Sequence, residues 1–111
     1  MVISFQNHYA RDQLLEEGEV YTYRWTRRAF FRKEKGNTEK TWANSGRGKP
    51  RIVDVEITEI GQIDIESKEI EPFLDGSGFP NVEYWRLVAI DYQGGRHARH
   101  IGWLYHVKVM S

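Results

Sequence analysis

Residues 51–65 read RIVDVEITEIGQIDI, and this stretch decides the fold class. Val53, Val55 and Ile57 alternate with polar residues, which is the period of a β-strand with one buried face. The alternation slips at residues 59–60 and Gly61 follows, which indicates a bulge or a sharp bend. A long bent strand of this kind is typical of a small barrel, where the sheet has to turn a corner.

Toward the N-terminus, two further strands and a helix are expected. Residues 2–5 form a short strand, and Asn7 caps a helix over residues 8–17 that ends at Gly18. Residues 19–25 alternate as a strand. Its larger side chains, Tyr21, Tyr23 and Trp25, are expected to face the main packing surface, which leaves Val20, Thr22 and Arg24 on a face with a small polar cleft.

Toward the C-terminus, Ser67 is expected to cap a short helix reaching Leu74, and Asn81 a helix from about Val82 to Tyr92. Residues 103–109 form the last strand, with Trp103, Tyr105, Val107 and Val109 on one face. This order predicts an α+β fold, a small and mostly antiparallel β-barrel with covering helices, spanning residues 1–111 as one domain.

Residues 26–50 are predicted to form a long basic loop. Ala29-Phe30-Phe31 could extend the preceding strand, and the remainder is rich in turn residues. Long loops in compact domains are commonly functional or mobile. This loop carries Trp42, an aromatic side chain that a solvated linker does not need.

The charge is unevenly distributed although the net charge is zero. Residues 24–51 hold ten basic and two acidic side chains, a net charge of +8, whereas residues 52–75 hold one basic and eight acidic side chains, a net charge of −7. One interpretation is a basic face that meets an anionic partner. The other is that the two segments pair with each other across a sheet.

Composition excludes several classes of site. The chain has no cysteine, which excludes disulfides, thiolate nucleophiles and cysteine-ligated zinc. His97 and His100 have H-x-x-H spacing but stand among arginines without a third ligand, so no metal and no cofactor is expected. The sequence shows no apolar run long enough to cross a membrane and no leader-like N-terminus, and we expect a cytoplasmic protein.

Several motifs resemble the ASCH family of the PUA-like superfamily. Residues 14–24, LLEEGEVYTYR, are similar to the family's helix, glycine turn and strand of the form Gly-Lys-Lys-Thr-x-Glu-x-Arg. Residues 53–57 resemble its long central strand. Residues 78–85, GFPNVEYW, resemble its Gly-Phe-x-Ser-x-Glu-x-Trp helix start. The resemblance covers most of the chain except residues 26–50.

This resemblance implies a barrel that binds RNA through a cleft beside the motif strand, where Thr22 and Arg24 match the motif. Some bacterial relatives hydrolyse N4-acetylcytidine with a lysine, a threonine and a glutamate. The lysine position falls on Glu19 in this chain. The glutamate position falls in mid-chain, where Glu66, Glu69 and Glu71 are all candidates, and no catalytic set can be assigned.

The first hypothesis is therefore an RNA- or nucleotide-binding module. Its cations would contact phosphate groups and Trp42 would stack on an unpaired base. A small hydrolase acting on a modified nucleoside, and a protein-interaction domain that uses the basic loop, are the alternatives, and the oligomeric state stays open. The candidate binding residues are Thr22, Arg24, Arg27, Arg28, Arg32, Lys33, Lys35, Lys40, Trp42, Arg47 and Lys49.

Overall fold

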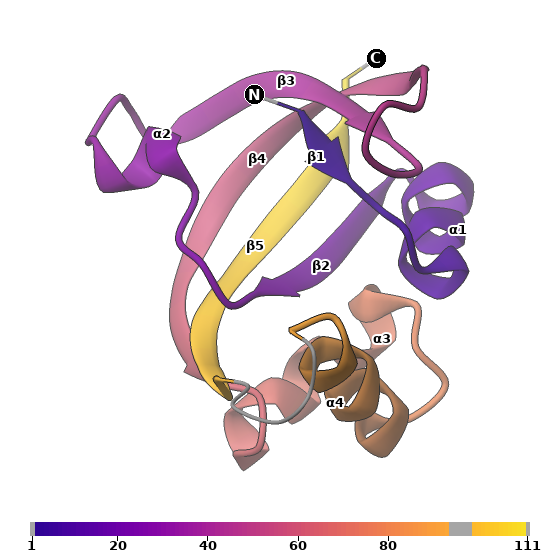
Figure 1. Ribbon diagram of the computed structural model, residues 1–111, viewed down its shortest axis with the longest axis vertical. Coiled ribbons are helices and arrows are strands. Elements are labelled where there is room, and N and C mark those ends of the chain that lie inside the picture. The colour runs from indigo at the N-terminus through magenta and orange to yellow at the C-terminus, as the bar shows by residue number, and fades with distance from the viewer. Residues whose placement is uncertain (1, 94–98, 111) are drawn as a thin grey trace.

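The structure is a computed structural model that describes residues 2–93 and 99–110. Its centre is a curled five-stranded sheet (Figure 1). The β1–β3 pair is parallel and the other three neighbouring pairs are antiparallel. The predicted α+β class is confirmed, but the sheet is mixed and forms a half-barrel, because within the described residues its edges β1 and β2 do not pair with each other. In spatial order the strands are β1 (Ile3–Ser4), β3 (Thr38–Asn44), β4 (Arg51–Asp64), β5 (Ile101–Val109) and β2 (Glu19–Arg24).

The long bent strand predicted at residues 51–65 is confirmed as β4. Its register against β5 shifts between Glu59 and Gly61. Gly61 has φ 151°, a conformation that side-chain-bearing residues rarely adopt. The irregularity lies where β4 and β5 curve together, so that their far ends turn toward the helices (Figure 1).

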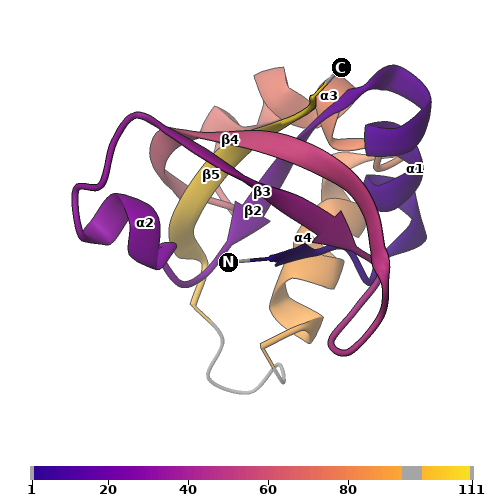
Figure 2. The same ribbon diagram turned by 90° about the horizontal axis from the view of Figure 1, so that it is seen from above.

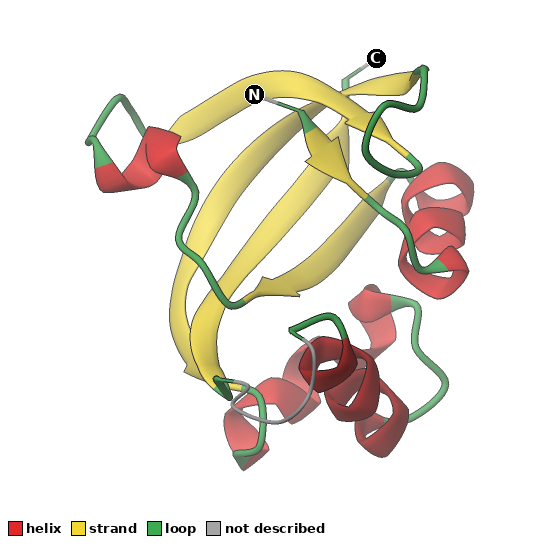
Figure 3. Ribbon diagram, viewed as in Figure 1, coloured by secondary structure: helices red, strands yellow, loops and turns green. Residues whose placement is uncertain are grey.

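The predicted helix starts are confirmed. The Asn7 side chain accepts a hydrogen bond from the backbone N–H of Tyr9 and caps α1 (His8–Glu17). Asn81 caps α4 (Val82–Asp91) in the same way. Ser67 caps a 3₁₀ helix, η1 (Lys68–Phe73), which runs directly into the short helix α3 (Leu74–Ser77). Figure 3 shows these helices beside and below the sheet.

The prediction of one long loop over residues 26–50 was wrong. Ala29–Arg32 forms the short helix α2, not an extension of the preceding strand, and Thr38–Asn44 forms β3 between β1 and β4. The inward side chains of β3 include Glu39 and Thr41, so its sequence lacks the apolar alternation that marks a half-buried strand. Pairing with β4 supplies the order that local sequence does not indicate.

Both faces of β2 are packed, because the curled sheet encloses one cluster and the helices cover another (Figure 2). Val20 belongs to the enclosed cluster, together with Leu14, Val55 and Val107. Tyr23 belongs to the second cluster, with Trp85 of α4. The expectation that the aromatic side chains of β2 face the main packing surface holds only in part, because the Val20 face is packed as well and Trp25 at the end of β2 is 45% exposed.

Candidate ligand-binding pocket

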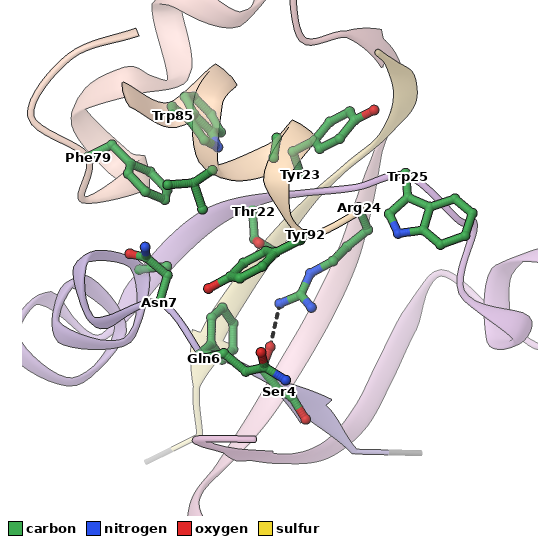
Figure 4. Close-up of a pocket in the computed structure, with 14 residues that line it drawn as sticks. Ser4, Gln6, Asn7, Thr22, Tyr23, Arg24, Trp25, Phe79, Trp85 and Tyr92 are labelled. Carbon is green, nitrogen blue, oxygen red and sulfur yellow. Dashed lines mark hydrogen bonds between the residues drawn. The ribbon is translucent and has the colours of Figure 1, made fainter. Parts of the chain in front are cut away.

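A cavity of about 250 Å³ lies between the unpaired edges of the sheet, β1 and β2. The chain from β1 into α1 forms one wall, β2 forms the second, and α4 forms the third (Figure 4). Because each wall comes from a different part of the sequence, only the folded chain creates this cavity. Its lining residues are Ser4, Phe5, Gln6, Asn7, Ala10, Thr22, Tyr23, Arg24, Trp25, Phe79, Trp85, Val88, Ala89 and Tyr92.

Arg24 is the cation of this pocket. Its Nη2 donates to the backbone carbonyl of Ser4 at 2.8 Å, which bridges the two sheet edges, and its guanidinium lies 5.2 Å from the centre of the Phe5 ring. Its Nε is buried and has no hydrogen-bond partner among the described residues. The residues lining the pocket include no carboxylate. Arg24 thus carries a charge that its described surroundings do not neutralise.

The surroundings of Arg24 are electropositive. Burial, and then the nearby charge of Arg28, lower the pKa of Arg24 to about 10, so the group remains charged at neutral pH. Asn7 places the N-terminal end of α1, which carries partial positive charge, at the pocket wall. Arg11 of α1 lies behind this wall and donates to the carbonyl of Phe5 at 3.2 Å.

Thr22 and Tyr92 add hydroxyl groups to the pocket. Thr22 shares the β2 face with Arg24, and no hydrogen bond of its hydroxyl is found among the described residues. Tyr92 is 55% exposed and extends toward Asn7 and Gln6 (Figure 4). Burial raises the pKa of Tyr92, while the Arg24 charge and a hydrogen bond with Asn7 act to lower it. Trp25 lies beyond Arg24, at the outer side of the pocket (Figure 4).

Two of the predicted phosphate-binding cations are held in ion pairs elsewhere. Arg27 donates to both carboxylate oxygens of Glu59, at 3.0 and 2.8 Å. Arg28 pairs with Glu39 at 2.8 and 3.2 Å, and both side chains are nearly buried. Tyr105 joins these pairs, because its hydroxyl accepts from the Arg28 backbone N–H and donates to Glu59. Arg28 is thus neutralised inside the curled sheet and Arg27 at a partly exposed position, and a phosphate would have to displace their carboxylates.

The outer face of the sheet mixes the two charged segments. Glu56 of β4 lies between two lysines, Lys40 on β3 and Lys108 on β5. Lys108 in turn lies opposite Glu19 of β2. Opposite charges therefore alternate across four strands, and this face is not a continuous basic surface. Trp42 lies on the same face, where the Arg51 guanidinium stacks 4.6 Å from the centre of its ring.

The remaining predicted cations lie in two separate groups. Arg32, Lys33 and Lys35 are exposed around the end of α2, before β3 begins. Arg47 and Lys49 are exposed in the hairpin loop, residues 45–50, after β3 ends. A seven-residue strand at about 3.3 Å per residue separates the groups by roughly 20 Å.

The hairpin loop is the group that lies next to the pocket. Asn44 accepts a hydrogen bond from the Ser4 hydroxyl at 2.7 Å and from the backbone of Gly46 at 3.2 Å, and it donates to the carbonyl of Lys49. A Cβ added at Gly46 would lie 3.6 Å from Cγ of Gln6, which lines the pocket. The hairpin loop that carries the exposed Arg47 and Lys49 therefore lies beside Gln6 at the pocket.

The catalytic set implied by the family resemblance is not assembled in this pocket. Glu66, Glu69 and Glu71 are exposed and do not line it. Glu19, at the lysine position, contacts His106 on the outer face at 3.1 Å. His97 of the H-x-x-H pair lies outside the described residues. Within the described ranges, no group of three potential metal ligands is found.

Sequence reasoning found Thr22 and Arg24 but missed most of the other pocket residues. Asn7 was predicted only as a helix cap and Tyr92 only as the end of a helix, and Gln6 was not singled out. The sequence signal that could have indicated a site role for Tyr92 was its position at the C-terminal end of α4, where a side chain need not pack against the core. Nothing local indicated that this turn lies beside Arg24.

No helix in the described part of the chain is long and apolar enough to cross a lipid bilayer. A scan against protein-family models, a search of curated proteins and a search of solved structures each found no match to this chain.

Proposed function

We propose that this protein is an ASCH-type module that binds RNA or a nucleotide at the pocket between β1 and β2. The observation that carries the proposal is Arg24, a cation placed in a cavity whose lining contains no acid. A buried charge is costly unless it is paired, so a site of this kind favours a ligand with hydrogen-bond acceptors or negative charge.

The lining chemistry supports a nucleotide. A ligand pocket typically combines apolar and aromatic walls with a few convergent polar groups. Here Phe5, Phe79 and Trp85 supply aromatic surface, while Thr22 and Arg24 supply the polar groups. The volume is below the roughly 300–1,000 Å³ that drug-sized ligands occupy, so the pocket holds one part of a nucleotide and the rest lies outside.

The position of the hairpin loop predicts which cations assist binding. Arg47 and Lys49 lie near the pocket, whereas Arg32 and Lys33 lie at the other end of β3. Replacing Arg47 and Lys49 by glutamine is expected to weaken binding of single-stranded RNA severalfold and to reduce its salt dependence. Each lost phosphate contact on a single strand lowers the log–log salt slope by about 0.7.

The matched control is the double glutamine variant of Arg32 and Lys33, which removes the same charge from the distant group. Fluorescence anisotropy with labelled single-stranded RNA at several salt concentrations measures both variants. Equal losses for the two variants would show that binding follows total charge and not the pocket. Absence of RNA binding by the unmodified protein at low salt would refute the RNA proposal.

A further inference from the structure

We propose that the group entering the pocket is a terminal phosphate monoester, carried by a free nucleoside monophosphate or by the end of an RNA strand. This inference rests on the proposed function and specifies its ligand. It depends on the donors of Arg24, on the neutral donors around them and on the shape of the site.

The first argument is charge. The Arg24 hydrogen bond to the Ser4 carbonyl uses one of the five N–H groups of the guanidinium, and its buried Nε has no partner among the described residues. Hydrogen bonds between a guanidinium and an ionised oxygen are roughly twice as strong as those between neutral groups. An anion therefore satisfies this cation better than the carbonyl of an uncharged base does.

The second argument is the set of groups that surround Arg24. The N-terminal end of α1 reaches the pocket at Asn7, and anions are stabilised there by the helix dipole and by backbone N–H groups. The hydroxyls of Thr22 and Tyr92 can each donate to an oxygen. A phosphate monoester presents three terminal oxygens, which suits donors that come from three different walls.

Glu83 and Asp91 are the acidic residues of α4. Neither lines the pocket, and both are exposed on the helix. The charge of Asp91 raises the pKa of Tyr92, but the charge of Arg24 lowers this pKa by a larger amount. The field inside the pocket is accordingly set by Arg24 and the end of α1.

The third argument is access. Arg24 lines the cavity of about 250 Å³, so a ligand group meets its guanidinium on this side by entering that cavity. An internal phosphodiester carries a sugar on each side, and both would have to leave through the same mouth. A terminal monoester carries one sugar, which can lie against the apolar side chains of Phe79 and Val88. The exposed Tyr92 and Trp25 are then available to the attached base.

The test compares RNA of one sequence with a 5′-phosphate, a 3′-phosphate or hydroxyls at both ends, and adds adenosine and uridine monophosphates with their nucleosides. We expect at least tenfold tighter binding of a phosphorylated end, and of monophosphates over nucleosides. Arg24→Met is expected to abolish the difference. Arg51→Gln, which removes an exposed cation stacked on Trp42 on the outer face, is expected to preserve it.

The outcomes separate the two proposals. Equal affinity for phosphorylated and hydroxyl-ended RNA, with loss of both in Arg24→Met, would overturn the monoester inference and leave the RNA pocket standing. Binding of monophosphates without binding of RNA would support the inference and refute the RNA function. Failure of every probe would overturn both. Urea unfolding of Arg24→Met confirms that the variant is folded before its affinities are compared.

Discussion

Replacing Arg24 and Arg28 separately by methionine distinguishes an arginine placed for a ligand from one placed for stability. Methionine keeps much of the aliphatic stem and removes the charge. Burial lowers the pKa of Arg24 to about 10, and at about 1.4 kcal/mol per pKa unit this corresponds to roughly 3–4 kcal/mol of unfavourable burial. Arg24→Met removes this cost.

The same substitution also removes favourable contacts of Arg24. The hydrogen bond to the Ser4 carbonyl contributes about 1.5–3 kcal/mol, and the stacking on Phe5 about 0.5–1 kcal/mol. The cost of burying the Arg24 charge and the gain from its contacts nearly cancel, so we expect the free energy of unfolding to change by no more than about 1 kcal/mol. Affinity for the ligand should nevertheless be lost.

Arg28→Met is expected to behave differently, because it removes the cation that forms an ion pair with the buried carboxylate of Glu39. Breaking a buried pair in this way costs about 3–5 kcal/mol. Urea unfolding followed by circular dichroism measures both variants at neutral pH, and the dependence of the unfolding free energy on urea should stay constant for the values to be comparable.

A loss of 3 kcal/mol or more in Arg24→Met would refute the reasoning. It would show that Arg24 is needed to hold β1 against β2 and that its charge is not poorly compensated. The pocket would then only mark the gap between the sheet edges β1 and β2, with no role in binding. A stable Arg24→Met that still binds ligand would also contradict the assignment of Arg24 to the site.

Two more predictions follow from close packing and from buried tyrosines. Gly102→Ala should lower the free energy of unfolding by about 2–3 kcal/mol in urea titrations, because its Cβ would lie 2.6 Å from the Arg24 carbonyl oxygen and from the Tyr23 hydroxyl. The control is Gly48→Ala, at an exposed position with φ 78° and open space around it, which should cost about 1 kcal/mol. Similar losses in the two variants would contradict the tight contact at Gly102. Burial raises the pKa values of Tyr23 and Tyr105 to about 12, so their contribution to stability is complete below pH 10 and is lost as the pH rises from about 10 to about 12. Tyrosinate absorbance should therefore show late ionisation steps near pH 12, and Tyr105→Phe should remove one of them. Absence of any step near that pH would show that neither tyrosine is buried.

The starts of α1, η1 and α4 could be predicted because capping is local. Asn7, Ser67 and Asn81 each stand directly before a helix and accept from its first free N–H groups. The bend in β4 was predictable for the same reason, since Gly61 interrupts a regular alternation. The strand β3 was not predictable, because Glu39 and Thr41 point inward and only the pairing partners β1 and β4 make that arrangement stable.

The candidate site shows the same division. Spacing along one strand placed Thr22 and Arg24 on a common face, and the charged segments were visible in the sequence. Which cations meet an acid was not, because Arg27 and Glu59 are 32 residues apart and approach each other only when the sheet curls. The sequence by itself determined the helix caps, the bent strand and the β2 face that carries Arg24. The tertiary structure alone decided that Arg28 is neutralised while Arg24 opens onto a cavity, since burial and charge pairing depend on distances between segments that local sequence does not set.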